Sequence, residues 1–204
     1  VGNPEHADHR EREQTALNCR LLLDKISIFR NNGELDRNYV FSYNRNPLPP
    51  KNSSSTDHWG YYNVNSKSTS DQTFHYAPSY YRTYRNSEGQ IQTGIWKGIN
   101  KNSCSDRSQY GVLTSIKFPT GAETHFEYEL NDFSNGFKDS ADSLIRSGGV
   151  LRIKTICDLS DKGDTISVRT FAYTDETGKS SGTLMSVPEY HYKVTAVSYT
   201  HLRA

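Results

Sequence analysis

The sequence predicts an all-β fold of antiparallel hairpins, stacked in a sheet or sandwich and joined by long irregular loops. Aromatic residues make up 12% of the 204 residues although only 33% are hydrophobic, and 14 residues are tyrosines. Tyrosine suits the half-buried pleated surface of a sheet better than a helical core. Short extended runs separated by turns that contain Gly support the same class, as does a hairpin pattern that recurs along the chain.

The N-terminal part holds a polar segment and a first hairpin. Residues 1–18 are polar and mixed in charge, and we expect a frayed end or a short helix there. Residues 19–29 are rich in Leu and Ile, a turn at 31–33 follows, and the extended pattern resumes at 39–43. These three stretches predict the hairpin.

The middle of the chain is expected to be irregular. Residues 44–70 contain many Pro and Ser residues, which discourage regular structure, around an aromatic cluster at 59–62. Residues 74–108 scatter Tyr and Trp among Asn, Ser and Gly, and we expect them to continue as loops.

A second hairpin gives the clearest local signal. Residues 112–118 and 122–129 are two extended runs joined by a turn at 119–121 that contains Pro and Gly. Because side chains alternate along a strand, one face of the second run is expected to meet water and the other to face the core with Ile116 and Phe118. The water-facing set is Glu123, His125, Glu127 and Glu129, and the core-facing set is Thr124, Phe126 and Tyr128.

A third hairpin is predicted after a polar stretch. Residues 132–147 are polar, and we expect a loop or a single helical turn that ends at Gly148 and Gly149. The hairpin then has strands at 150–157 and 165–173 around a turn at 161–164, with a further turn at 177–179.

The three hairpins share a template: an aliphatic residue, two positions, Ile, a turn with Gly, then Phe, one position and Tyr. Repetition implies stacking, because one hairpin alone cannot bury its apolar face. The alternative is a chance recurrence of Phe-x-Tyr in a chain rich in Tyr. The matching sets are Leu23, Ile26, Gly33, Phe41 and Tyr43; Leu113, Ile116, Gly121, Phe126 and Tyr128; and Ile153, Ile156, Gly163, Phe171 and Tyr173.

Two stretches of the second hairpin, residues 111–121 and 126–131, resemble the YD repeat of RHS-type proteins. Residues 57–63 and 148–154 resemble segments that flank such repeats in very large surface proteins of Bacteroidetes. The resemblance covers residues 19–193. The diagnostic Tyr-Asp followed by Gly-Arg is missing, so the resemblance implies a divergent region that leads into a repeat shell.

This resemblance implies a domain plan and a role. Residues 1–18 form a polar segment, residues 19–196 form the repeat-like region, and residues 197–204 resemble translated sequencing-adapter tails and are expected to be non-native. The chain, which begins with Val, is expected to be an internal piece of a large secreted or cell-surface protein, with a structural or interaction role and no catalysis of its own. Its partners would be the rest of the parent polypeptide and a cell-surface protein or glycan.

Charge and hydropathy exclude two classes of partner. The formal net charge is +1, from 24 basic and 23 acidic residues, so no long-range field recruits nucleic acid. No stretch approaches 18 consecutive apolar residues, and the first residues lack the features of a signal peptide. We therefore expect neither nucleic-acid binding nor a membrane span, and no motif calls for a cofactor.

The candidate ligand-binding residues are Trp59, Tyr61 and Tyr62 with Asp57. Aromatic faces beside polar groups can stack on sugar rings, so the alternative function is a carbohydrate-binding module. The structural interpretation is that Trp59 fills the core while Gly60 lets the chain pass close beneath it.

Catalytic and metal sites are not predicted. Alternating glutamates supply the spacing of a glycosidase pair on any exposed strand, and neighbours on one strand project in parallel, so an enzyme built on Glu127 and Glu129 is disfavoured. His6 and His9 with Cys19 lack a fourth ligand nearby. The odd number of cysteines allows at most one disulfide, and Cys157 is expected to be a buried free thiol.

Overall fold

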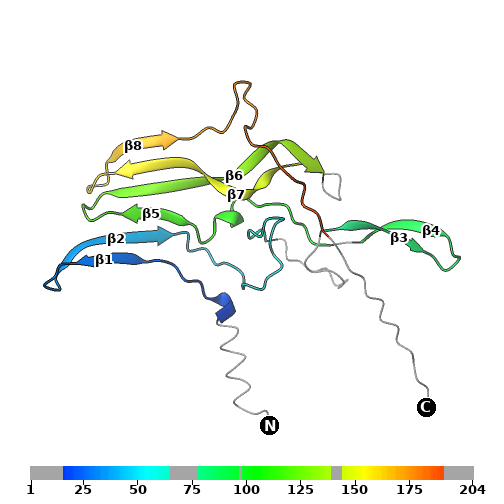
Figure 1. Ribbon diagram of the computed structural model, residues 1–204, viewed down its shortest axis with the longest axis horizontal. Helices are drawn as coiled ribbons and strands as arrows, with labels where there is room; N and C mark the ends of the chain where they lie inside the picture. The colour runs from blue at the N-terminus through cyan, green and yellow to red at the C-terminus, as the bar shows by residue number, and fades with distance from the viewer. Residues whose placement is uncertain (1–15, 65–77, 97, 139–143, 191–204) are drawn as a thin grey trace, which may run out of the picture.

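The structure is a computed structural model that describes residues 16–64, 78–96, 98–138 and 144–190. These residues form a six-stranded antiparallel sheet in the order β1-β2-β5-β6-β7-β8 and a separate β3–β4 hairpin that projects from one end (Figure 1). The predicted all-β class is confirmed. The elements are β1 (Lys25–Phe29), β2 (Leu35–Tyr43), β3 (Tyr80–Arg85), β4 (Ile91–Trp96), the 3₁₀ helix η1 (Arg107–Gln109), β5 (Leu113–Lys117), β6 (Glu123–Lys138), β7 (Leu144–Leu159) and β8 (Thr165–Thr170).

The three predicted hairpins are all present and share one turn geometry. In each turn, the N–H of the first residue donates to the carbonyl four residues later, and a Gly three residues later donates back to the first carbonyl. That Gly has a φ between +83° and +89°, a left-handed conformation that other residues adopt only at a cost. The first, Gly and last residues are Arg30, Gly33 and Glu34; Phe118, Gly121 and Ala122; and Ser160, Gly163 and Asp164.

Two stretches that were predicted to be irregular form strands instead. Within residues 74–108, β3 pairs with β4 across a turn at Asn86 and Gly89 that has the same hydrogen bonds as the other hairpins. Within residues 132–147, β6 continues to Lys138 and β7 already begins at Leu144. The polar residues of β6 belong to a strand because a distant segment binds them: the N–H and Oγ of Ser134 both donate to the carbonyl of Gly182.

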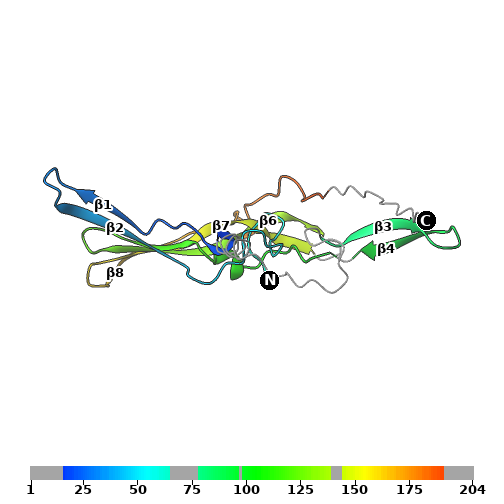
Figure 2. The same ribbon diagram turned by 90° about the horizontal axis from the view of Figure 1, so that it is seen from below.

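The six-stranded sheet is one layer thick where β1, β2, β5 and β8 flank the long central pair, as its edge-on view shows (Figure 2). Directly paired residues project to the same side, so the register assigns each side chain to a face. One side, the apolar face, carries Ile26, Tyr39, Phe41, Ile116, Phe126, Tyr128, Ile153 and Ile156. The other, the polar face, carries Ser27, Ser42, Ser115, Lys117, Glu123, His125 and Glu127.

The apolar face remains partly exposed in the described part of the chain. Ile26 and Ile28 on the edge strand β1 are 43% and 42% exposed. Phe41, Ile116, Phe126 and Ile156 are half-buried by their neighbours within the sheet. Among the described residues, no helix is long and apolar enough to cross a membrane.

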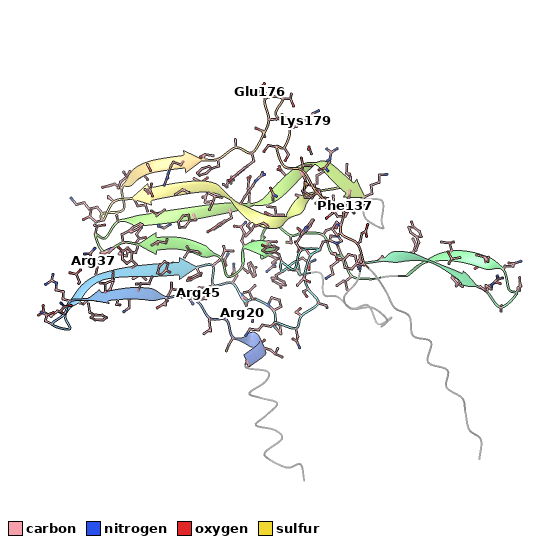
Figure 3. The ribbon with its side chains drawn as sticks, viewed as in Figure 1. Arg20, Arg37, Arg45, Phe137, Glu176 and Lys179 are labelled. Carbon is pink, nitrogen blue, oxygen red and sulfur yellow. The ribbon has the colours of Figure 1, made fainter. Side chains whose placement is uncertain are left out.

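Full burial occurs at the other end of the sheet. Phe133 and Phe137 of β6 are 4% and 8% exposed and, with Ile99, are the buried apolar residues of the described chain. Here the β6–β7 register shifts between Leu130 and Phe137, which bends the pair around the loop that holds Trp59. Figure 3 labels Phe137 in this region, at the opposite end of the sheet from the turn that joins β1 to β2.

Candidate functional site

Asp57 organises the loop that contains the candidate binding residues. Asp57 is buried, with only 2% of the residue exposed. Oδ1 accepts hydrogen bonds from the backbone N–H groups of Trp59 and Tyr61, both at 2.9 Å, and Oδ2 accepts one from the Ser103 hydroxyl. Both carboxylate oxygens therefore hold the loop in shape, in the way that Asp side chains stabilise turns.

Two more buried polar residues fix this loop to residues 100–102. Asn63, which is 2% exposed, donates from Nδ2 to the carbonyls of Asn100 and Asn102, at 2.9 and 3.2 Å. Lys101, which is 6% exposed, donates from Nζ to Oγ1 of Thr56 at 3.0 Å. Burial lowers the pKa of Lys101, and the nearby carboxylate of Asp57 opposes that change.

Trp59 lies over Gly148 and Gly149 of β7. A Cβ on Gly149 would be 3.6 Å from three atoms of the indole ring, and a Cβ on Gly148 would overlap the ring. The structural interpretation expected Gly60 to let the chain pass close beneath Trp59. Gly60 is exposed and, apart from its two chain neighbours, no atom lies within 4 Å of a Cβ built there, so the close approach is made by Gly148 and Gly149 instead. The φ of +94° at Gly60 serves the turn.

The aromatic rings of the loop contact different neighbours. Trp59 packs against Phe133, with ring centroids 6.2 Å apart, and Tyr62 against Tyr110, at 5.7 Å. His58 contacts both Trp59 and Phe137, at 5.7 and 5.5 Å. Trp59, Tyr61 and Tyr62 are each half-buried. The structure thus brings the four candidate residues into one loop but engages Asp57, Trp59 and Tyr62 with the chain's own side chains and backbone.

The alternating acidic residues of β6 fall into different environments. Glu123 accepts hydrogen bonds from Lys117 and His125, each at 3.1 Å, and these bonds lower the pKa of Glu123. Glu127 is exposed, as predicted. The alternation had predicted that Glu129 is freely exposed. It is not, because Nε of Arg152 donates to its Oε1 at 2.7 Å.

Arg152 is the centre of a cluster that the sequence analysis missed. Its side chain is 16% exposed, and its Nη1 donates to Oδ1 of Asp132 at 2.7 Å. Its guanidinium lies 4.2 Å from the ring centroid of Tyr173, a cation–π contact. Ser180 also donates to Asp132, at 2.6 Å. Burial raises the pKa of Asp132, but the hydrogen bonds from Ser180 and Arg152 outweigh burial and lower it.

A hollow of about 410 Å³ lies beside this cluster. Asp132 on its wall is already bound to Arg152 and Ser180, whereas Arg146 and Lys179 are exposed. Figure 3 shows Lys179 and Glu176 at a turn that projects from the sheet. The hollow therefore presents two exposed cationic side chains to a ligand. Its described lining residues include no acid–base pair. Its lining residues are Asp132, Phe133, Ser134, Arg146, Lys179 and Ser180.

The cysteine and histidine predictions have mixed outcomes. Cys19, Cys104 and Cys157 are all free thiols, and Cys157 is half-buried rather than fully buried because the polar face of a single-layer sheet is open. His6 and His9 lie outside the described residues, as do residues 197–204. Within the described ranges, no group of three or more His, Cys, Asp or Glu side chains could hold a metal ion.

Comparisons with known proteins do not assign this chain to a family. No family model, curated protein or solved structure matches the chain.

Proposed function

We propose that this chain is a structural or interaction segment of a large secreted or cell-surface protein of the RHS/YD-repeat type, with no catalysis of its own. The observation that carries the proposal is the single-layer sheet, whose apolar face is partly exposed from β1 to β7. Sheets with one apolar face are normally covered on that face. The rest of the parent polypeptide is the cover that we propose.

The register between hairpins supports a repeated structural unit. Phe41 pairs with Ile116 where the first hairpin meets the second, and Phe126 pairs with Ile156 where the second meets the third. The template Tyr pairs in the same way: Tyr43 with Leu113, and Tyr128 with Ile153. Equivalent residues thus meet at both junctions, which favours a repeated unit over chance recurrence of Phe-x-Tyr.

A shared hydrogen bond supports the same conclusion. The hydroxyl of Tyr43 donates to the carbonyl of Leu23 at 3.0 Å, and the hydroxyl of Tyr173 donates to the carbonyl of Ile153 at 2.7 Å. In both hairpins, the last residue of the template therefore binds the first. The Tyr of the template has a role in closing its own hairpin, and this role needs no ligand.

The environment of the aromatic loop favours structure over sugar binding. A sugar platform needs neighbouring rings exposed on one surface. Trp59 instead lies over two glycines of β7, and both oxygens of Asp57 bind groups of the chain. Carbohydrate binding through this loop is therefore the less supported function.

Limited trypsin digestion tests the proposal. Arg37 on β2 is exposed and lies on the apolar face, opposite Ile28, whereas Lys162 is exposed in a hairpin turn. If the rest of the parent polypeptide covers the apolar face, Arg37 should be cut in this chain and protected in the full reading frame. Lys162 serves as the control and should be cut in both. Equal cleavage at both sites in both proteins would refute a covered structural segment.

Labelling of intact cells tests the proposed location. An amine reagent that does not cross membranes should modify Lys162 in the parent protein before the cells are lysed. Modification of Lys162 only after lysis would contradict a secreted or cell-surface location.

A further inference from the structure

On both edge strands of the sheet, the backbone N–H and C=O groups of alternate residues face outward, away from the neighbouring strand. The N–H of Phe171, just after β8, donates to the carbonyl of Lys154 at 3.0 Å, so alternate residues along this strand face β7 and those between them face outward. Val168 and Thr170 are outward-facing by this rule. On β1, Asp24 accepts from the N–H of Phe41 at 2.9 Å, which leaves Lys25 and Ser27 facing outward.

The register at the internal junctions predicts what would fit these edges. At both junctions, the Phe of one template lies opposite the Ile of the next. Among the described strands, Phe171 has no such Ile opposite it and Ile26 has no such Phe, because β8 and β1 are the two ends of the sheet. Placing Phe171 opposite Ile26 also places Thr170 opposite Ser27, and both of these residues direct their backbone groups outward.

We propose that the β8 edge of one chain binds the β1 edge of a second copy, head to tail, in the register that pairs Phe171 with Ile26. The inference rests on the hairpin unit of the proposed function but adds a partner and a register to it. Tyr173 lies beyond the paired segment, because its carbonyl already accepts the N–H of Ser181 at 3.0 Å. The pairing therefore joins residues 168–172 to residues 25–29.

Side chains and charge agree with this pairing. It sets Val168 opposite Phe29, which are 57% and 60% exposed in the single chain, so each would cover apolar surface of the other. Phe171 and Ile26, at 40% and 43% exposed, would likewise cover each other. A formal net charge of +1 provides little repulsion between copies. β8 also lacks Pro, which natural edge strands often use against such pairing.

Two proline variants test the two edge strands separately. Val168→Pro removes an outward N–H from β8, and Ser27→Pro removes one from β1, without removing a hydrogen bond to the neighbouring strand. Because the contact joins different surfaces, the wild-type chain should keep adding copies as its concentration rises. By sedimentation equilibrium, we expect its average mass to more than double between about 10 µM and 1 mM.

The variants should complement each other. Each alone should remain a single chain over that range, whereas an equimolar mixture should give a species of twice the chain mass, through the intact β8 of Ser27→Pro and the intact β1 of Val168→Pro. Dimers of Ser27→Pro alone would instead indicate pairing of β8 with β8 and would overturn the proposal. A wild-type chain that stays monomeric would also overturn it, yet protection of Arg37 from trypsin in the full reading frame would leave the proposed function intact.

Disulfide trapping tests the register and does not depend on the proline variants folding. In a Cys19→Ser background, a mixture of Thr170→Cys and Ser27→Cys chains should cross-link under mild oxidation, since directly opposed residues lie within disulfide reach. Thr170→Cys mixed with Lys25→Cys is the matched control and should cross-link at least tenfold less. Equal trapping of both pairs would refute the register, and no trapping of the first pair would refute the contact.

Discussion

At the scale of single residues, polar side chains and glycines fix where the irregular segments meet the sheet. Asp57 holds its own loop and reaches Ser103, 46 residues away in sequence. Arg152 joins β6 to β7 and contacts Tyr173 beyond β8. None of these contacts could be predicted from the sequence, because local spacing carries no information about partners that only the folded register brings together.

Gly148→Ala tests the contact between Trp59 and β7. A Cβ there would overlap the indole ring and lie 2.6 Å from Oγ of Ser103, in a backbone with a φ of +146°. We expect a loss of unfolding free energy of about 2 to 6 kcal/mol, from backbone strain of about 1 to 3 and overpacking of about 1 to 3 kcal/mol. Urea denaturation measures it.

Gly163→Ala is the matched control, since Gly163 has a φ of +87° but nothing within 4 Å of a Cβ. It should show only the backbone strain, about 1 to 3 kcal/mol. Equal losses for the two variants would contradict the packing of Trp59 on β7.

The Arg152 cluster should make the stability depend on pH. The hydrogen bonds of Asp132 lower its pKa in the folded protein below that in the unfolded chain. The folded state therefore binds fewer protons, so this stabilisation is present above the unfolded pKa of about 4 and is lost as the pH falls through the folded pKa. Asp132→Asn should lower the urea midpoint at pH 7 and flatten its fall below about pH 5.

Glu176→Gln is the control for this experiment because Glu176 is exposed in a turn. It should leave the pH profile of the wild-type protein unchanged. A profile of Asp132→Asn that matches the wild type throughout would show that the cluster does not contribute to stability.

At the scale of elements, the sequence predicted the hairpins well because their turns are local. Each turn needs a Gly at one fixed position, and this requirement is visible in the sequence. The turn at Asn86–Gly89 carries the same signal but was overlooked among the polar residues around it. The strand ends at 132–138 and 144–147 were missed for a different reason. Gly182 and Leu184, far along the chain, accept hydrogen bonds from Ser134 and Asn135 on β6, and residues 144–147 pair in turn with β6.

The face assignment of β6 can be tested by a pair of substitutions on adjacent residues. Phe126 is on the apolar face and half-buried, and Glu127 is exposed on the polar face. Phe126→Ala should reduce the unfolding free energy by about 1 to 2 kcal/mol, because half of a Phe side chain remains in contact with water. Glu127→Gln should change it by less than about 0.5 kcal/mol. Equal changes in chemical denaturation would contradict the assignment.

At the scale of the whole molecule, the sequence predicted the class but left sheet and sandwich open. Alternation along a strand identifies an apolar face, but it cannot say whether that face is covered. Where β1, β2, β5 and β8 flank the central pair, the main sheet is one layer in which Phe41, Ile116, Phe126 and Ile156 come from successive hairpins. The cross-strand register, more than any single motif, supports the proposal that this sheet is built from a repeated unit.

A measurement of nuclear Overhauser effects between Hα protons tests that register most directly. Phe41 with Ile116, and Phe126 with Ile156, are opposed pairs without mutual hydrogen bonds, where Cα atoms approach to about 4.5 Å. Both pairs should give strong Hα–Hα cross-peaks in dilute protein. A slip by one residue would turn every apolar side chain to the polar face. Cross-peaks from Phe126 to Thr155 or Cys157 in place of Ile156 would contradict the repeated sheet on which the proposed function depends.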